Sequence, residues 1–217
     1  MKGQWADMGN VKIGRIVLGA ISTNCYFLFN DEINEAVIFD PADEGAKIYE
    51  AMKANGFKVV GICLTHGHFD HIYGVAKLKQ LSKALVYAST LEKDLLSDEK
   101  LNQSEMFGKI ATVTPDVLLD DGEEFELGGI KIKMISTPGH TEGSCCYYIE
   151  AASILISGDT LFEGSVGRTD MPTGSMSALV TNVKEKLFLL PDETVCYPGH
   201  GGATTIGDEK KYNPFLS

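Results

Sequence analysis

Short apolar runs separated by polar turn residues dominate the hydrophobic pattern in the first half of the chain. They are rich in β-branched and aromatic residues, and their length suits strands rather than helices. One of them, residues 59–64, is apolar almost throughout and predicts a buried strand that leads directly into a histidine-rich loop. The strands predicted in this half are residues 12–18, 25–29, 35–39, 59–64 and 86–88.

Helical spacing of apolar residues occurs in two segments between these strands. Residues 45–55 predict a helix that stops before a glycine, and residues 71–82 predict a second helix with one apolar face. Residues 91–107 combine charged side chains with scattered apolar ones. We expect this segment to be partly helical and partly a surface segment or lid, with its charges solvated.

The second half repeats the order of strand followed by polar loop. Two apolar runs flank Gly128 and Gly129 and predict a hairpin. Residues 175–190 predict a helix with Ser175 as its N-terminal cap and a proline beyond its end. By itself this pattern specifies only a mixed α and β fold. The strands predicted in this half are residues 124–127, 130–135, 144–149, 153–156 and 194–197.

All five histidines follow the ends of predicted strands. Three lie in the run T-H-G-H-F-D-H at residues 65–71, and each of the other two ends a P-G-H sequence. An aspartate closes the apolar run that begins at residue 154. Imidazole nitrogens and carboxylate oxygens together suit zinc, iron or manganese. The candidate metal ligands are His66, His68, Asp70, His71, His140, Asp159 and His200.

The spacing within the histidine-rich run predicts two ions rather than one. His66 and His68 are two residues apart, so in an extended segment both rings point to one side and can bind one ion. Asp70 continues this alternation, but His71 breaks it. The chain is therefore expected to turn at that point and to present Asp70 and His71 to a second ion.

Each ion needs further ligands from elsewhere in the chain. We expect His140 to complete the first ion, His200 to complete the second, and Asp159 to bridge them. Such shells are incomplete, and the open position, where water binds, distinguishes a catalytic site from a structural one. A structural zinc site is the alternative, but no cysteine pair has zinc-finger spacing.

Two metal ions about 3.5–4 Å apart can share a water and lower its pKa toward neutrality. The resulting bridging hydroxide would attack an ester-like carbonyl while a metal polarises the carbonyl oxygen. If the substrate is a thioester, the leaving thiolate has a pKa of about 8.5 and needs little protonation. On this hypothesis Asp70 and Asp159 are the catalytic carboxylates.

Four sequence motifs resemble those of the metallo-β-lactamase superfamily. They are H-G-H-F-D-H at residues 66–71 with Gly74 after it, G-H-T-E-G-S at 139–144, G-D-T-L-F at 158–162 and P-G-H-G at 198–201. The stretch L-F-E-G-S-V-G-R-T-D-M-P-T-G-S at 161–175 and the ending N-P-F-L at 213–216 resemble the short hydroxyacylglutathione hydrolases, or short type II glyoxalases.

The resemblance implies an α+β fold, an αβ/βα sandwich of two mixed sheets with outer helices. The candidate ligands span both halves of the chain, so we expect residues 1–217 to form a single metallo-hydrolase domain. The implied cofactor is a pair of divalent ions, zinc first, with iron or manganese as alternatives. The implied activity is hydrolysis of small-molecule S-acyl thioesters such as S-lactoylglutathione.

Residue differences from known branches of the superfamily show which of them this chain does not resemble. The antibiotic-cleaving enzymes of the common zinc class carry arginine in place of His71 and cysteine in place of Asp159, and flavodiiron proteins carry glutamate in place of His68. Longer glyoxalases add a helical C-terminal domain that binds glutathione, whereas only residues 201–217 follow the last histidine here. That shortening leaves glutathione specificity open.

Several residues near the candidate ligands have two interpretations each, one functional and one structural. Arg168 lies where longer relatives have a substrate-contacting lysine, so it could bind a carboxylate of the substrate, or it could pair with nearby Asp170. Asp40 resembles a family position that could hydrogen-bond a ligand histidine, or it could form a turn before its proline. Thr65 and Thr141 flank ligands and could orient their rings or cap local turns.

Charge and composition exclude several partners. The formal net charge of −11 would repel a polyanion such as nucleic acid at long range. No apolar stretch approaches the roughly 20 residues of a membrane helix, and residues 1–6 lack a signal-peptide core, so we expect a cytoplasmic protein. The five cysteines predict reduced thiols. The oligomeric state is left open.

Two alternative functions remain. Persulfide dioxygenases share a G-R-T-D segment like residues 167–170 and hold one iron, which His66, His140 and Asp159 could bind here. A non-catalytic metal-binding interaction domain is the other alternative. Metal stoichiometry and oxygen uptake distinguish the first, and loss of a ligand would have favoured the second.

Overall fold

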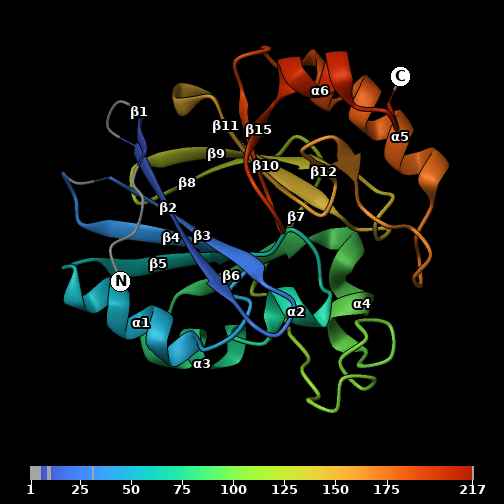
Figure 1. Ribbon diagram of the computed structural model, residues 1–217. Coiled ribbons are helices and arrows are strands. Elements are labelled where there is room, and N and C mark those ends of the chain that lie inside the picture. Colours follow the sequence, from blue (N-terminus) through green and yellow to red (C-terminus); the bar gives the residue numbers. More distant parts are fainter. Residues whose placement is uncertain (1–5, 9–10, 31, 217) are drawn as a thin grey trace.

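Two β-sheets pack face to face between outer helices in the computed structural model, which describes residues 6–8, 11–30 and 32–216 (Figure 1). The first sheet has seven strands in chain order, antiparallel from β1 to β4 and parallel from β4 to β7. Its strands are β1 (Ala6–Met8), β2 (Val11–Leu18), β3 (Thr23–Asn30), β4 (Glu35–Phe39), β5 (Lys58–Cys63), β6 (Leu85–Ser89) and β7 (Val117–Leu119).

The second sheet has six strands in the order β15-β14-β11-β10-β9-β8. Only β11 and β14 are parallel neighbours, and the other pairs are antiparallel. A separate ribbon of β12 (Leu161–Phe162) and β13 (Ser165–Val166) follows β11. The six strands are β8 (Glu124–Leu127), β9 (Ile130–Ser136), β10 (Cys145–Ile149), β11 (Ile154–Gly158), β14 (Val195–Pro198) and β15 (Thr204–Thr205).

Helices cover the outer face of each sheet (Figure 1). α1 and α3 pack on the first sheet, α5 and α6 pack on the second, and α2 and α4 lie near one edge of the sandwich. The helices are α1 (Gly45–Ala54), α2 (Phe69–Ile72), α3 (Val75–Ser82), α4 (Lys93–Ser97), α5 (Met176–Glu185) and α6 (Ile206–Tyr212), with 3-10 turns at Thr90–Glu92, Glu150–Ala152 and Leu187–Leu189.

Strand β3 shows why its sequence is apolar at nearly every position. Phe27 and Phe29 pack among residues of the outer helices, whereas Tyr26 and Leu28 pack against the second sheet. Successive side chains of a strand point to opposite faces, and both faces of this sheet are covered. Full burial of one such side chain contributes about 1.5–3 kcal/mol, so this central strand anchors the sandwich.

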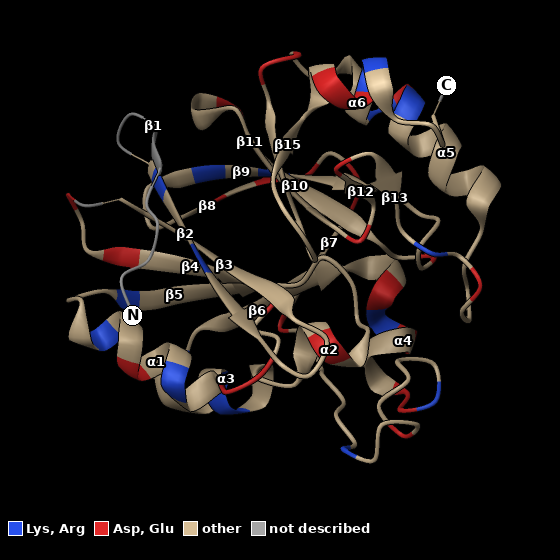
Figure 2. Cartoon of the chain, viewed as in Figure 1, with Lys and Arg blue, Asp and Glu red and all other residues tan. Residues whose placement is uncertain are grey.

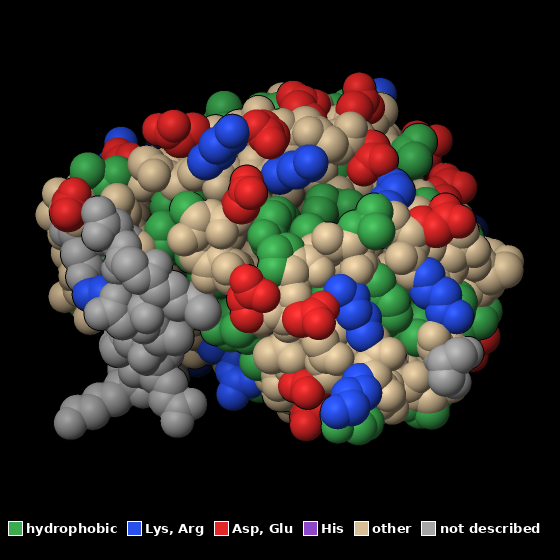
Figure 3. Space-filling model, turned by 90° about the horizontal axis from the view of Figure 1, so that it is seen from above, with side chains coloured by type: hydrophobic (Ala, Val, Ile, Leu, Met, Phe, Trp, Pro, Cys, Tyr) green, Lys and Arg blue, Asp and Glu red, His purple; other side chains and the backbone are tan. Residues whose placement is uncertain are grey.

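Charged side chains lie mainly on the outer helices and the connecting loops (Figure 2). The face over α5 and α6, seen in Figure 3, intersperses acidic and basic side chains rather than gathering the basic ones into a patch. Within the described part of the chain, every helix is too short or too polar to cross a bilayer. Most of residues 1–6, on which the expectation of no signal peptide rests, lie outside the described residues.

The predicted strands and the hairpin at Gly128 and Gly129 are confirmed, and both glycines have positive φ, 58° and 70°. Six short elements were not predicted, namely β1, β7, β12, β13, β15 and α6. Strands of two or three residues are too short for the alternation of side chains to be visible in the sequence. Their positions depend on neighbours that are distant in the chain.

Two predicted helices are wrong in extent. Residues 71–82 do not form one helix, because α2 ends at Ile72 and α3 begins at Val75. The amide of Gly74 donates to the Pro41 carbonyl instead of continuing the helix, and a Cβ at Gly74 would lie 2.4 Å from that oxygen. The helix predicted over 175–190 ends at Glu185 and continues as a 3-10 turn, although Ser175 caps it as predicted.

Candidate metal centre

The candidate ligands follow the ends of four strands, β5, β9, β11 and β14, at the edge of the sandwich that carries α2 and the β12–β13 ribbon (Figure 1). Strand-terminal loops on a rigid core hold side chains at fixed separations. The structure brings all seven predicted residues together. Three sets of donor atoms lie within 4.8 Å of one another: His66, His68 and His140; His66, His71 and Asp159; Asp70, His71 and His200.

The first group consists of three buried histidines. His68 Nδ1 lies 2.9 Å from His140 Nε2, and His140 Nε2 lies 3.2 Å from His66 Nε2. The three residues are only 1–2% exposed. Their ring nitrogens therefore converge on one point beneath the surface.

The second group adds carboxylates. Asp70 Oδ2 lies 3.3 Å from both His71 Nε2 and His200 Nε2. Asp159 lies between the groups, with Oδ1 3.5 Å from His71 Nε2 and Oδ2 3.7 Å from His140 Nε2. Asp159 therefore contacts both groups, as the bridging prediction requires.

Hydrogen bonds outside the cluster determine which nitrogen of three rings is free to bind a cation. His71 Nδ1 lies 3.0 Å from Asp40 Oδ2, and His140 Nδ1 lies 2.7 Å from the Arg168 carbonyl. Both oxygens can only accept, so each ring donates from Nδ1, and Nε2 is the nitrogen that faces the cluster and can bind a cation once it is unprotonated. The reading of Asp40 as a hydrogen-bond partner of a ligand histidine is confirmed.

Thr65 orients the third ring. Its hydroxyl donates to Asp40 Oδ2 at 2.7 Å and lies 3.1 Å from His66 Nδ1, so it accepts from the histidine and leaves His66 Nε2 unprotonated. The unprotonated Nε2 atoms of His66 and His140 then face each other at 3.2 Å. Two lone pairs at that separation repel each other unless a cation lies between them.

Unpartnered buried atoms also fit a cation. Among the described residues, His71 Nε2 and Asp159 Oδ1 are buried without a hydrogen-bond partner, although buried polar atoms nearly always have one. Both atoms point into the cluster, within 3.5 Å of each other. A donor set of imidazoles and carboxylates with such vacant lone pairs suits divalent zinc, iron or manganese.

Burial and neighbouring charges shift the pKa values of the cluster in both directions. Burial, together with the neighbouring histidines, lowers the pKa of His66 well below its usual value and that of His68 to about 3. Burial alone would raise the pKa of Asp159, but His71 and other histidines outweigh it, so the pKa falls. The pKa of His71 is raised, because Asp70 and Asp159 outweigh the effect of its burial.

The turn in the histidine-rich run occurs earlier than predicted. His68 is the last extended residue, and α2 begins at Phe69, so Asp70 and His71 lie in a helix. Asp70 therefore does not continue the strand-like alternation of His66 and His68. The assignment of Asp70 and His71 to the second group is nevertheless what the structure shows.

Glycine at position 199 is required by the cluster. A Cβ there would lie 2.2 Å from Asp159 Oδ1 and 2.6 Å from His71 Cε1. The backbone before His200 therefore passes directly over two other candidate ligands. The P-G-H sequence marks this close approach, but the residues it approaches are visible only in the fold.

Arg168 contributes through its main chain as well as its side chain. Its carbonyl accepts the hydrogen bond from His140, and its guanidinium forms a two-point ion pair with Asp170, with Nε–Oδ1 2.7 Å and Nη2–Oδ2 2.9 Å. The predicted ion pair between Arg168 and Asp170 is therefore confirmed. A role for Arg168 in substrate binding stays a prediction.

Glu92 is the main residue that the sequence did not reveal. The expectation that the charges of residues 91–107 are solvated is wrong for this side chain, which is 1% exposed. Its carboxylate accepts from the Gly67 amide at 2.8 Å and from the Thr141 hydroxyl at 3.0 Å, and burial raises its pKa to about 7. A charged residue in a polar segment has no periodic signal that would mark it as buried.

A cleft of about 740 Å³ opens above the cluster. Its floor includes His68, Asp70, His140, Asp159 and His200. Its walls come from the β2–β3 turn, α2, the segment 103–107, β12 and the segment 168–172. The cleft gives the candidate ligands access to a small molecule.

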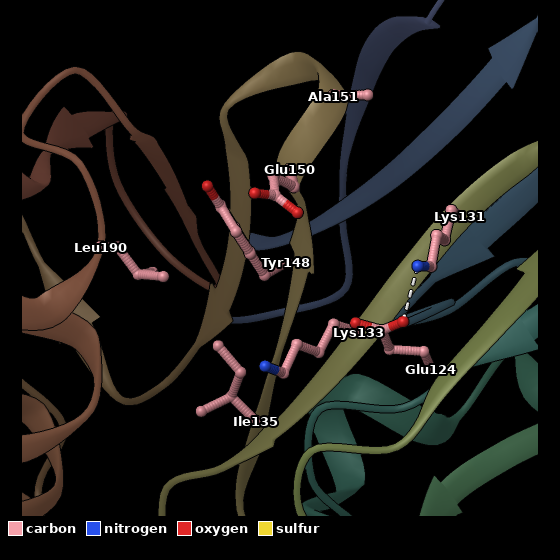
Figure 4. A pocket seen from close by; sticks show the side chains of 8 residues that line it. All are labelled: Glu124, Lys131, Lys133, Ile135, Tyr148, Glu150, Ala151 and Leu190. Carbon is pink, nitrogen blue, oxygen red and sulfur yellow. Dashed lines mark ion pairs between the residues drawn. The ribbon is translucent and has the colours of Figure 1, made fainter.

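A second pocket lies on the second sheet, away from the cluster (Figure 4). It measures about 410 Å³, and an ion pair between Lys131 and Glu124, 2.6 Å apart, forms part of its wall. Figure 4 shows Lys133 and Tyr148 beside Ile135 in the same pocket. None of the predicted site residues lines it.

Comparison with known proteins places this geometry in a family. Residues 18–200 match the model of the metallo-beta-lactamase superfamily. The probable metallo-hydrolase YqgX of Bacillus subtilis is 40% identical over 95% of this chain and 98% of its own length. The hydroxyacylglutathione hydrolase GloC of Haemophilus influenzae is 33% identical over 96% of this chain and 98% of its own.

Several solved structures are similar to this chain in both fold and sequence. The BLEG-1 B3 metallo-beta-lactamase superposes with a TM-score of 0.89 at 39% identity, covering 94% of this chain and 99% of its own. TTHA1623 in a di-iron-bound form superposes at 0.83 with 35% identity, covering 93% and 99%. ETHE1 from Myxococcus xanthus superposes at 0.79 with 27% identity, covering 93% and 83%. The predicted αβ/βα sandwich of two mixed sheets is confirmed.

Proposed function

The chain belongs to the metallo-beta-lactamase superfamily, and on that premise we propose that it is a metal-dependent hydrolase of small-molecule thioesters. The likeness to the hydroxyacylglutathione hydrolase GloC supports a thioester rather than another ester-like substrate. The observation that carries the proposal is the convergence of seven donor side chains, three of them with their free nitrogen fixed by outer hydrogen bonds.

Two divalent ions, zinc first, are the proposed cofactor, and the di-iron form of TTHA1623 supports iron as an alternative. When bound, such ions lower the pKa of water toward neutrality and polarise a carbonyl oxygen. The residues that would hold the first ion are His66, His68 and His140, those for the second are Asp70, His71 and His200, and Asp159 would contact both.

Asp70 and Asp159 are the proposed catalytic carboxylates. Their side chains are 10% and 13% exposed, so each reaches the floor of the cleft while most of it is buried. Burial would raise both pKa values, but the histidines around them outweigh it and lower them. Both carboxylates are therefore anionic at neutral pH and can accept a hydrogen bond from the attacking water, which orients it toward the thioester carbonyl.

A thiolate leaving group is consistent with the small number of free titratable side chains in the cleft, because it needs no proton donor. Among the described residues that line it, the acidic and basic side chains other than the candidate ligands are Arg168 and Asp170, which pair with each other. A thiolate, with a pKa of about 8.5, departs without a separate proton donor. An alkoxide or amine leaving group would need one.

Elemental analysis and a substrate panel test this proposal together. We expect two metal ions per chain and hydrolysis of S-lactoylglutathione or another acyl thioester that is lost on chelation and restored by adding metal. One equivalent of iron with oxygen consumption on a persulfide would replace the proposal with the dioxygenase alternative.

Hydrolysis of β-lactams is a second candidate, because the BLEG-1 B3 metallo-beta-lactamase covers 94% of the chain at 39% identity. Asp159 and His71 separate this chain from the common zinc class of antibiotic-cleaving enzymes, and the likeness to BLEG-1 concerns a different class. A β-lactam amide nitrogen needs protonation on departure. Adding nitrocefin to the same panel distinguishes this candidate.

A further inference from the structure

Part of the cleft wall is apolar although it faces solvent. Ile21, Met106 and Phe107 line it and are 45%, 76% and 55% exposed. Phe69 and Phe162 line it deeper in. Exposed large apolar side chains also occur elsewhere on the described surface, but several of them around one concave site are typical of a ligand-binding groove.

These walls are fixed to the candidate metal centre. The rings of Phe107 and Phe69 stack with centroids 4.0 Å apart, and the Phe69 amide donates to the Asn102 carbonyl at 2.9 Å. Phe69 directly precedes Asp70 in α2. A group held against these rings therefore lies beside the proposed catalytic carboxylates.

Apart from the proposed metal ions, the side chains of the cleft provide little for binding an anion. Arg168 is the one lysine or arginine among the described residues that line it, and two of its nitrogens already donate to Asp170. The carboxylates of Asp70, Asp159 and Asp170 also face this space. A thiol such as glutathione carries two carboxylates, and each would need a cationic or multiple N–H partner to offset its desolvation.

We propose that this site selects thioesters whose acyl group is apolar and uncharged, a refinement that rests on the proposed thioester hydrolase function. The acyl chain would lie against Phe69, Met106 and Phe107, with its carbonyl over the cluster. Each methylene buried there strengthens binding by about fourfold. Selectivity comes from the walls, whereas the reaction takes place at the floor.

The test is a series of N-acetylcysteamine thioesters, from acetyl to octanoyl, compared with S-lactoylglutathione on the metal-loaded protein. We expect kcat/KM to rise about threefold to fourfold per methylene until the cleft is filled, and hexanoyl to exceed S-lactoylglutathione. A flat series, or a preference for S-lactoylglutathione, overturns this proposal and leaves the thioester hydrolase standing. If the loaded protein cleaves no thioester, the proposed function fails and takes this refinement with it.

Matched variants locate the selectivity. Phe107→Ser should lower kcat/KM for hexanoyl about tenfold more than for acetyl, because it removes a wall of the cleft. Ile110→Ser is the control, since Ile110 is also exposed, at 67%, but does not line the cleft. An unchanged ratio of hexanoyl to acetyl in Phe107→Ser would contradict the placement of the acyl chain.

A different observation carries a second inference, about Glu92. Its buried carboxylate accepts from the Gly67 amide, between His66 and His68, and from the Thr141 hydroxyl, which directly follows His140. The two loops are separated by more than 70 residues in the sequence, as the pairing of His68 with His140 shows. One side chain therefore connects both loops that carry the first group of histidines.

The fit around Glu92 leaves no room for another arrangement. A Cβ at Gly143 would lie 2.3 Å from Glu92 Oε2, and a Cβ at Gly67 would lie 2.7 Å from Leu95 Cδ2. Glycine at 143 allows its loop to approach the carboxylate, and glycine at 67 allows the other loop to pack against the helix that follows Glu92. We infer that Glu92 is a positioning residue that sets the spacing of His66, His68 and His140.

Glu92→Gln tests this role, because glutamine keeps the size but turns one acceptor into a donor that faces the amides. We expect affinity for one of the two zinc ions to fall about 10–100-fold while the other is retained. In the metal-free protein, exchange of the Gly67 amide hydrogen should speed up at least tenfold.

Asp94→Asn, an exposed acidic position two residues along the same segment, is the control and should change neither quantity. Equal loss of both ions with a lowered Tm would show a purely structural role, and unchanged affinity for both would show none. Either result overturns the assignment.

Discussion

The floor and the walls of the cleft are built in opposite ways. The floor consists of buried side chains whose orientation is fixed by partners outside the cluster, such as Asp40 for His71 and the Arg168 carbonyl for His140. The walls consist of exposed apolar side chains, such as Met106 at 76% and Phe107 at 55%. The reacting groups and the side chains that select the substrate therefore belong to different parts of the cleft.

In the floor, a change in one residue also affects its neighbours more strongly than it does in the walls. Asp40 alone accepts from the Thr65 amide, the Thr65 hydroxyl and His71 Nδ1, at 2.8, 2.7 and 3.0 Å. In a connected buried network, the loss of one member leaves its partners unsatisfied. Exposed wall residues have fewer buried hydrogen-bond partners, so their replacement should change the preference between substrates more than it changes kcat.

The largest expected effect comes from removing the residue that joins the two groups. Asp159→Ala should lose at least one metal ion and lower kcat by roughly a thousandfold or more, because the two groups then lack their shared carboxylate. Metal content and thioester hydrolysis measure this directly. Two ions and near-normal kcat in the variant would mean that Asp159 does not bridge.

The buried acid behind the floor makes stability depend on pH. Glu92 has a folded-state pKa of about 7 against 4.5 for the free group, so the folded protein holds the proton between these values and loses relative stability as pH rises through them. Glu92→Gln should remove about 3 kcal/mol of the decline in the unfolding free energy between pH 4.5 and 7.

Urea unfolding of metal-free wild type and Glu92→Gln at several pH values measures this difference. The control is Asp94→Asn, which should follow the wild-type curve. Parallel curves for wild type and Glu92→Gln would show that Glu92 titrates alike in the folded and unfolded states.

A smaller effect is expected at Asp40, which is not a candidate ligand but hydrogen-bonds the candidate ligand His71. Asp40→Asn should lower metal affinity or kcat/KM about 10–100-fold, because the amide cannot hold the proton of His71 and the Thr65 hydroxyl in the same way. Zinc competition titration and kinetics check it. Wild-type affinity would indicate that His71 is oriented by its other neighbours.

The smallest effect is expected at the exposed pair on the rim. If Arg168 acts by pairing with Asp170, then Arg168→Ala and Asp170→Asn should change kcat/KM equally and by less than about fivefold, since exposed ion pairs contribute little. A rise in KM confined to Arg168→Ala would instead support the substrate-binding role predicted from the sequence. Michaelis–Menten kinetics on one thioester separates the two.

The sequence predicted the floor better than the walls for a physical reason. Few residue types serve as metal ligands, and several candidates here follow a strand that holds them, so residue type and local pattern together identify His66, His140 and Asp159. A wall residue such as Phe107 needs only to be apolar, and many apolar residues in this chain are core. Sequence therefore does not distinguish it.

By itself the sequence determined the longer strands of both sheets, the strand-then-ligand order and the full set of candidate ligands, because these depend on side-chain period and donor chemistry. Only the tertiary structure decided that Glu92 is buried between two loops and that the backbone at Gly199 passes over Asp159 and His71. Each of these follows from contacts between segments distant in the chain, which local pattern does not record. The same contacts set which lone pairs are left facing one another in the cluster.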